Sequence, residues 1–234
     1  MKIVPFFRSL SRSVHEEHND HDHDQQESKT GIDISGPSGA CTSISLTVWR
    51  KSLVINCKGF TVIDSNGDLV YRVDNYVGHP REVTLMDGSG KSVLTMRRNK
   101  KFSLVESWFM YEGEVGDFCC TERTIRAAAK RWPVFCVKKN QNLLNAKYPS
   151  IIAHVYREVS GSHRRCAYVI EGSYTHRSCK VLEEFSRNVV AEIKRKEANV
   201  GGVSYGVEVF HLVVHPGFHP GFAMALVLLL DQMF

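Results

Sequence analysis

Two clusters of basic side chains have the residue types and the spacing that binding of an anion requires. Arg97, Arg98, Lys100 and Lys101 form the denser cluster, and Lys194, Arg195 and Lys196 form the second. Both patterns indicate exposed turns between two strands. Several cations on such a hairpin tip attract an inositol phosphate or an anionic leaflet, each contributing about 1 kcal/mol near that surface. The alternative is an ordinary solvated surface, because exposed turns are commonly charged.

A third basic segment follows the only adjacent pair of cysteines. Arg123, Arg126, Lys130 and Arg131 recur at near-helical spacing, which suits the phosphates of DNA or lipid, or simply a solvated helix. A palmitoyl group on Cys119 or Cys120 would supply a second signal for membrane attachment, and ordinary free thiols are the alternative. No helix-turn-helix or zinc-finger spacing is present, so readout of DNA bases is not predicted.

Motifs for catalysis are missing from the sequence. It contains no Cys-x-x-Cys pair, no Gly-x-Ser-x-Gly elbow, no phosphate loop and no dinucleotide fingerprint. The histidines His15, His18, His21 and His23 stand among acidic residues and could capture a transition metal loosely, but a structural zinc site requires fixed geometry. We therefore predict a protein that is not an enzyme and that uses neither a cofactor nor a metal.

The positive charge of the chain is concentrated after residue 40. Residues 1–40 carry seven acidic and four basic side chains, although the whole chain has a formal net charge of +5. A basic body suits an anionic partner, such as lipid headgroups or nucleic acid. Seven scattered cysteines without a secretory signal predict reduced thiols in the cytoplasm, with attachment to a membrane surface, a nuclear location or both.

The chain divides into a polar leader and one β domain. Residues 1–40 hold few large apolar side chains, so we predict that they are disordered. Residues 41–234 show about twelve short strands joined by tight turns, with an insert at 113–131. Expected strands include Leu53–Ile55, as a continuation or restart of Ser45–Trp49, and also Leu104–Tyr111 and Tyr205–Val213. Asn66 and Gly67 are expected to supply the positive-φ residues of a hairpin turn.

The C-terminal stretch decides between fold classes, since Phe222 to Leu230 is apolar at every position. A helix that is apolar on all sides must be enclosed by protein or by lipid. The length of this helix is only about half the thickness of a roughly 30 Å hydrocarbon core. We therefore predict enclosure by protein and no transmembrane segment. A β-sandwich core, about 10 Å thick, has no room for a helix, whereas a barrel of about a dozen strands does.

The predicted fold is mainly β: a closed antiparallel barrel of about twelve strands around a buried apolar C-terminal helix. The side chains expected to plug the barrel are Phe222, Met224, Leu226, Val227, Leu228, Leu229 and Leu230. Pro220 is well placed as an early residue of this helix, where its missing N–H costs little.

Several motifs, in this order along the chain, resemble the plant LURP-one-related family. They include Trp49–Leu53, Tyr71–Tyr76, Leu94–Arg98, Glu171–Tyr174, Val190–Lys196 and the ending Met224–Met233. The resemblance runs from about Ser45 to Phe234 and leaves out the leader and residues 113–131. It implies a barrel around a central C-terminal helix, as in the tubby-like C-terminal superfamily, which also includes the phospholipid scramblases.

The resemblance also implies a class of function. Tubby-like proteins are thought to bind phosphoinositides at the membrane and to act in transcription after release, and some LURP-one-related members are linked to plant defence. We therefore expect a binding and regulatory module that attaches to phosphoinositides or anionic membranes through its basic hairpin tips. The alternative is a nuclear, DNA-associated regulator or a protein-interaction scaffold without lipid binding.

Overall fold

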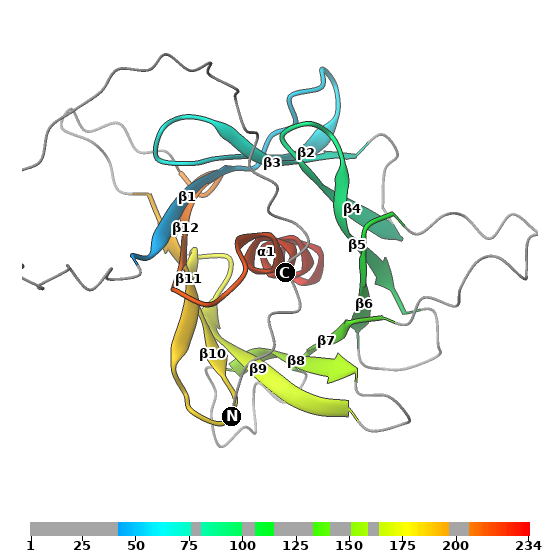
Figure 1. The fold of residues 1–234 in the computed structure, drawn as a ribbon, viewed down its shortest axis with the longest axis vertical. Helices are drawn as coiled ribbons and strands as arrows, with labels where there is room; N and C mark the ends of the chain where they lie inside the picture. The colour runs from blue at the N-terminus through cyan, green and yellow to red at the C-terminus, as the bar shows by residue number, and fades with distance from the viewer. Residues whose placement is uncertain are drawn as a thin grey trace, which may run out of the picture. The chain divides into compact units, whose positions relative to one another are not determined.

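The chain folds into a β-barrel with a helix at its centre (Figure 1). The computed structural model describes residues 42–75, 81–99, 106–114, 133–140, 151–158, 164–196 and 206–234. The strands are β1 (Ile44–Trp49), β2 (Lys58–Ile63), β3 (Leu69–Asn75), β4 (Glu82–Asp87), β5 (Ser92–Arg98), β6 (Ser107–Glu112), β7 (Phe135–Lys139), β8 (Ile151–Glu158), β9 (Arg164–Ser173), β10 (Ser178–Glu183), β11 (Val189–Arg195) and β12 (Val209–Val214). The helix α1 spans Pro220–Met233.

Antiparallel pairing joins all the described strands into one closed sheet. Each strand pairs with the strands before and after it in the sequence, and β1 pairs with β12 to complete the barrel. In that last pair Leu46 stands opposite Leu212 and Val48 stands opposite Phe210, and all four side chains are buried. Closure leaves no unpaired edge among the described strands. The predicted fold, a closed antiparallel barrel around a C-terminal helix, is confirmed.

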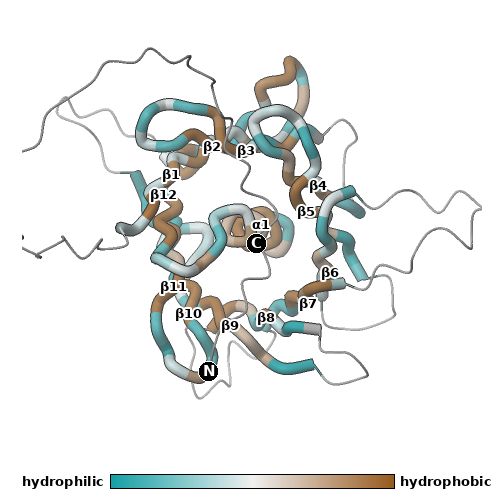
Figure 2. Tube along the Cα trace, viewed as in Figure 1, coloured by the Kyte–Doolittle hydropathy of each residue, from teal (hydrophilic) through white to brown (hydrophobic). Residues whose placement is uncertain are grey.

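The helix α1 fills the interior of this barrel. Every residue from Gly221 to Leu230 is buried, and Met224, Leu226 and Leu228 are at most 1% exposed. Figure 2 shows the corresponding hydropathy, with α1 largely hydrophobic and many turns hydrophilic. The residues predicted as the plug all lie in this buried stretch: Phe222, Met224, Leu226, Val227, Leu228, Leu229 and Leu230. Within the described residues, no helix has the length and hydrophobicity needed to cross a bilayer.

The helix begins with Pro220, which follows the N-cap residue His219. Nδ1 of His219 accepts a hydrogen bond from the backbone N–H of Phe222 at 3.3 Å. This contact satisfies one of the N–H groups that have no acceptor within the helix. Burial lowers the pKa of His219 from the usual 6.5, so the ring is neutral and can accept this bond at neutral pH.

We expect the protein to lose stability as the pH falls below about 6.5, the pKa of histidine in an unfolded chain. Protonated His219 cannot accept the Phe222 N–H, and its charge opposes the positive N-terminal end of the helix dipole. Its contribution is therefore fully present above that unfolded-state pKa and is lost as the pH falls through the lower folded-state pKa. Urea unfolding between about pH 7.5 and about pH 5 measures the effect.

The control for this prediction is His219→Asn, because asparagine caps a helix without titrating. The variant should show a smaller loss of unfolding free energy on acidification. His211, whose pKa is also lowered by burial and by Lys196, accounts for part of the loss that remains. Equal losses in the wild type and in His219→Asn would contradict a role for the cap.

One predicted strand is replaced by a loop. Leu53–Ile55 neither continues nor restarts β1, because residues 50–57 form bends and turns. The backbone N–H of Val54 donates to Oγ of Ser52 at 3.0 Å, and the N–H of Cys57 donates to the Val54 carbonyl at 3.2 Å. These local bonds satisfy the backbone within the loop and take the place of strand pairing.

The turn between β2 and β3 also differs from the prediction in its details. Gly67 has a positive φ of 93°, but Asn66 does not have a positive φ. The Asp64 carboxylate instead accepts hydrogen bonds from the backbone N–H groups of Asn66 and Asp68, at 2.8 and 3.0 Å. The turn therefore needs only one residue with a positive φ, because hydrogen bonds to the Asp64 carboxylate hold the rest of its backbone.

Polar contacts attach the C-terminal end of α1 to the barrel. The Asp231 carboxylate lies 2.8 Å from Nε of Arg50 and accepts a hydrogen bond of 3.2 Å from the Tyr174 hydroxyl. Nζ of Lys139 donates to the carbonyl of Met233. The last turn of α1 contains no basic residue, so these barrel cations stabilise the negative end of the helix dipole.

Several predicted features lie wholly or partly outside the described residues. The leader 1–40 does so entirely, and only Gly113 and Glu114 of the insert 113–131 are described. The predicted strands Leu104–Tyr111 and Tyr205–Val213 correspond to β6 and β12 where they are described.

Candidate functional site

The alternation of strand direction brings the ends of the odd-numbered strands and the starts of the even-numbered strands to one rim of the barrel. Trp49 pairs with Val209 there, and Ser178 pairs with Lys194, the neighbour of Arg195. The described residues of both predicted basic clusters belong to this rim, because they lie at the ends of β5 and β11. We call it the basic rim. The helix α1 also ends at this rim.

The first basic cluster is largely neutralised where it is described. Arg97 and Arg98 were expected in a turn, but they are the last two residues of β5, because pairing with β6 extends to Arg98 opposite Trp108. The Arg97 guanidinium bonds to the carboxylate of Glu82, which stands opposite it on β4. Arg98 lies 3.2 Å from Glu106. These ion pairs reduce the positive charge that the cluster offers to a ligand.

The second basic cluster also lies at a strand end. Lys194 and Arg195 complete β11, and Lys196 follows them, so the expected turn begins later than predicted. The strand extends this far because both of its neighbours continue to pair with it: Lys194 stands opposite Ser178 of β10 and opposite His211 of β12. This register surrounds the cluster with residues from two other strands.

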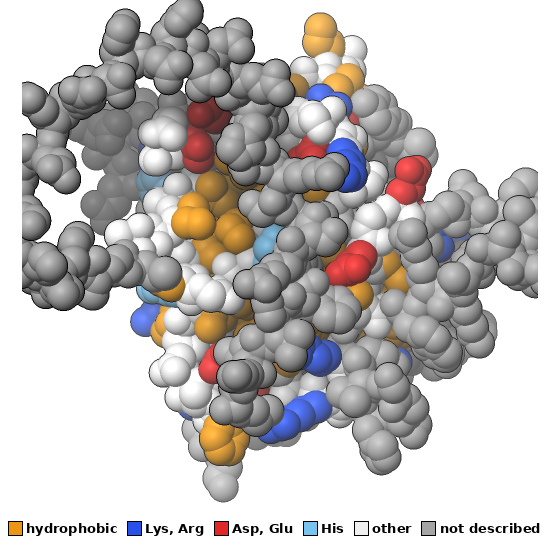
Figure 3. All heavy atoms as spheres, in the orientation of Figure 1, with side chains coloured by type: hydrophobic (Ala, Val, Ile, Leu, Met, Phe, Trp, Pro, Cys, Tyr) orange, Lys and Arg blue, Asp and Glu red, His pale blue; other side chains and the backbone are white. Residues whose placement is uncertain are grey.

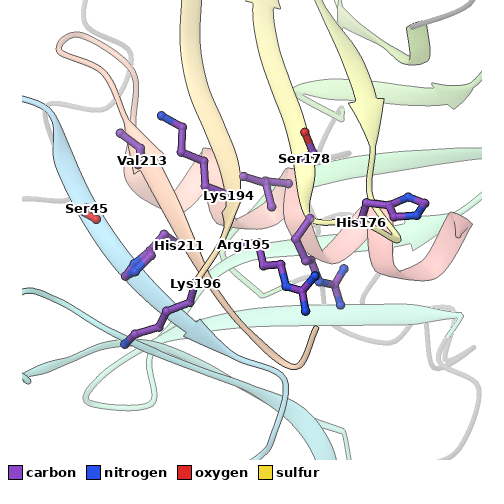
Figure 4. Close-up of a pocket in the computed structure, with 10 residues that line it drawn as sticks. Ser45, His176, Ser178, Lys194, Arg195, Lys196, His211 and Val213 are labelled. Atoms are coloured by element: carbon purple, nitrogen blue, oxygen red, sulfur yellow. The ribbon is translucent and has the colours of Figure 1, made fainter. Parts of the chain in front are cut away.

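A pocket of about 630 Å³ lies at this cluster, between β10, β11, β12 and β1 (Figure 4). It brings together cationic and imidazole side chains, namely His176, Arg177, Lys194, Arg195, Lys196 and His211. No Asp or Glu is found among the described residues that line it. The volume falls within the range of about 300–1,000 Å³ that is usual for small-ligand sites. The charge of the lining selects an anion.

Arg177 is the most buried cation of the pocket, with 5% of the residue exposed. Its Nε donates to the Val207 carbonyl at 2.8 Å, and its Nη1 donates to the Tyr174 carbonyl at 3.2 Å. The guanidinium carbon lies 4.1 Å from the centre of the Tyr174 ring and 4.6 Å from that of Phe210. These contacts hold a positive charge in a fixed place, which lowers the cost of organising the site around an anion.

His211 lies in the pocket close to Lys196. Burial, followed by repulsion from Lys196, lowers the pKa of this imidazole. Its Nδ1 is buried and makes no hydrogen bond to any described residue. A polar atom in this state can be satisfied by a ligand or by water. In Figure 4 the His211 ring and the Lys196 side chain lie on the same side of the strands.

Glu192 lies further along the outer face of β11, where Lys194 and His215 flank it. Its carboxylate is 3.2 Å from Nζ of Lys194 and 3.3 Å from Nε2 of His215. Burial alone would raise the pKa of Glu192, but the hydrogen bonds from Lys194 and His215 and the charge of Lys180 lower it. Glu192 therefore reduces the positive charge of Lys194, as Glu106 does for Arg98, while Arg177, Arg195 and Lys196 add further cations to the pocket.

Charge of both signs is present outside the pocket. On the face shown in Figure 3, basic and acidic side chains lie in small groups of either sign around the described surface. The pocket differs from such a surface because several elements contribute cations to it and its described lining holds no carboxylate.

Sequence reasoning found only the contiguous part of this site. It identified Lys194, Arg195 and Lys196, but missed His176, Arg177 and His211. The strand register brings His211 opposite Lys194, and no local motif signals that pairing. The other candidates, Lys100, Lys101, Cys119, Cys120 and the basic segment Arg123–Arg131, lie outside the described residues.

The metal-ligating and thiol side chains of the described residues were predicted to have no catalytic role. No three His, Cys, Asp or Glu side chains in the described part of the chain are placed to hold a metal. Burial raises the pKa of Cys166 to about 11, with a smaller effect of Glu184, and burial raises that of Cys179 to about 12. Both thiols are therefore protonated at neutral pH, and a protonated thiol is a poor nucleophile.

Comparison with known proteins identifies close relatives over most of the chain. The family model described as LURP-one-related matches residues 44–231. Protein LURP-one-related 17 of Arabidopsis thaliana is 47% identical over 99% of this chain and 100% of its own length. Protein LURP-one-related 8 of the same plant is 44% identical over 82% of this chain and 88% of its own length.

A solved structure shares the fold. The X-ray structure of an Arabidopsis thaliana protein superposes with a TM-score of 0.56 and covers 83% of this chain and 93% of its own. The two sequences are 24% identical, so the likeness concerns the fold alone.

Proposed function

The chain belongs to the LURP-one-related family, and we propose that it is a non-enzymatic module that binds the phosphorylated headgroups of an anionic membrane, phosphoinositides in particular. The basic pocket between β10, β11, β12 and β1 is the binding site. The proposal includes a cytoplasmic protein that attaches reversibly to the membrane surface. A regulatory role in plant defence and a relation to tubby-like regulators and scramblases belong to it through the family resemblance.

The observation that carries the proposal is the composition of the pocket. Arg177, Lys194, Arg195 and Lys196 line one concave site, and its described lining lacks carboxylates. Phosphate oxygens accept charge-assisted hydrogen bonds from such groups, which are stronger than neutral hydrogen bonds. A phosphoinositide headgroup carries several phosphates, so it can engage more than one of these cations at once.

The same charges could attract nucleic acid, which is the basis of the alternative nuclear function. A pocket on the curved wall of a barrel favours a compact headgroup, because a DNA duplex needs an extended surface with regularly spaced phosphate contacts. A protein-interaction scaffold would use this site only for a partner that presents acidic or phosphorylated groups to it. The membrane proposal therefore explains the pocket best.

The direct test neutralises the exposed part of the pocket with the triple substitution Lys194→Gln, Arg195→Gln and Lys196→Gln. Each cation contributes about 1 kcal/mol near an anionic surface, so affinity should fall roughly a hundredfold. The measurement is co-sedimentation with phosphatidylcholine vesicles that contain a phosphoinositide, and titration with soluble inositol trisphosphate. Both affinities should decrease.

The matched control removes three cations from the opposite rim: Lys91→Gln, Arg157→Gln and Arg165→Gln. This variant has the same net charge as the pocket variant, but it should bind vesicles nearly as the wild type does. Equal losses in the two variants would show that net charge, and not the pocket, determines binding. Unchanged vesicle binding by the pocket variant, together with its loss of salt-sensitive DNA binding, would favour the nuclear alternative.

A further inference from the structure

The loop that joins β1 to β2 exposes two large aliphatic side chains at the basic rim. Ile55 is 85% exposed and Leu53 is 52% exposed. In Figure 1 this loop projects beyond the strands, and its tip is hydrophobic in Figure 2. Ile55 is among the most exposed large hydrophobic residues described, together with Phe185. Exposure of neighbouring aliphatic side chains in water is unfavourable, and such a site commonly contacts a partner.

The loop holds these side chains outward through bonds to the barrel. Ser52 is 6% exposed, and its hydroxyl donates to the Asp74 carboxylate at 2.5 Å. The Thr61 hydroxyl donates to the Lys51 carbonyl at 2.8 Å. Asn56 adopts a positive φ of 63°, a conformation that reverses the chain sharply. The exposed tip is thus anchored at its base, so little conformational entropy is lost when it contacts a partner.

The apolar tip lies on the same rim as the end of the basic pocket that holds Arg177, Arg195 and Lys196. The loop leaves the barrel after Trp49, which pairs with Val209 of β12, and β12 in turn pairs with the end of β11 at Arg195. Trp49 is 42% exposed and Val207, just before β12, is 41% exposed. Exposed apolar side chains therefore continue along the rim from the loop toward the pocket.

Lys51 precedes the two exposed aliphatic residues in the sequence and Lys58 follows them, so the loop has a basic residue on each side of its apolar tip. This combination fits the boundary between headgroups and acyl chains of an anionic bilayer. There, aliphatic side chains enter the outer hydrocarbon while Lys and Arg remain among the phosphates.

We propose that the β1–β2 loop inserts Leu53 and Ile55 into an anionic leaflet while the basic pocket holds a headgroup of the same leaflet. This inference rests on the proposed function, because it assigns the pocket to a lipid headgroup. It adds a second attachment and an orientation, with the basic rim facing the membrane. Two weak attachments together give a stable but reversible association, as is known for peripheral membrane proteins.

The test is the double substitution Leu53→Ser and Ile55→Ser. Affinity for vesicles containing a phosphoinositide should fall at least about tenfold, because two aliphatic side chains lose their apolar contact. Affinity for soluble inositol trisphosphate should stay at the wild-type value, because the pocket is intact. The pocket variant described above should lose both affinities, which separates the two proposals.

The matched control is Phe185→Ser, which removes a ring that is 91% exposed in the β10–β11 turn at the opposite rim. It should bind vesicles as the wild type does. Wild-type vesicle affinity in the Leu53→Ser/Ile55→Ser variant would overturn the insertion, while leaving the headgroup proposal intact if the pocket variant fails to bind. A dimer in the wild type that becomes a monomer in the loop variant would assign the tip to a second copy of this chain and would also overturn the insertion.

Discussion

Replacement of Leu228 with aspartate is expected to leave no folded protein. Leu228 is 1% exposed and lies in the middle of α1, enclosed by the barrel. A carboxylate there would be either a lone buried charge or a buried acid without partners, and both cost several kcal/mol. The lost aliphatic contacts add to this cost. Because domains are stable by only about 5–15 kcal/mol in total, one such change is enough to unfold the chain.

Circular dichroism and the amount of soluble protein measure this outcome. Leu228→Met serves as the control, because a hydrophobic substitution of similar volume usually costs less than about 1.5 kcal/mol. The methionine variant should fold with a slightly lower melting temperature. A soluble Leu228→Asp variant with a native β spectrum would mean that position 228 reaches water, which contradicts an enclosed helix.

Removal of residues 220–234 is expected to give an insoluble product. The deletion takes away α1, whose apolar side chains occupy the centre of the barrel. Each large aliphatic or aromatic side chain contributes about 1.5–3 kcal/mol when it is fully buried, so the loss exceeds the stability of an ordinary domain. The inward faces of the strands would then be exposed and would associate between chains.

The control for this deletion removes the leader, residues 1–40, which is a longer segment. The leader is polar and precedes the region matched by the family, so the melting temperature should stay almost unchanged. A soluble protein without residues 220–234 that keeps a cooperative thermal transition would show that the barrel is stable without its helix.

The architecture was predictable because two patterns agree over most of the chain. The stretch Phe222–Leu230 is apolar on every side, which demands enclosure. Strands such as β12 alternate, with Phe210, Leu212 and Val214 buried and the residues between them partly exposed. Local detail was less predictable: Leu53–Ile55 has strand-forming residues, yet it forms a loop because Ser52 and Val54 provide local hydrogen bonds.

The candidate site was predictable only where its residues are contiguous. Lys194–Lys196 stand out as a basic run, but the pocket also depends on Arg177 and His211, which strand pairing brings close. Arg97 is a second case, because its sequence neighbours do not signal the contact with Glu82, which is 15 residues away along the chain. In each case the decisive contact depends on the register between strands, which a local motif does not encode.

Hydrogen exchange of the α1 backbone in the presence of anionic vesicles tests the central claim, that the barrel keeps its apolar helix while its rim meets the membrane. The amides of residues 222–230 should exchange only through global unfolding, at the same slow rate with and without vesicles, while protection changes at the β1–β2 loop and at the end of β11. Vesicle-induced loss of protection along residues 222–230 would show that the helix leaves the barrel, and it would contradict the account.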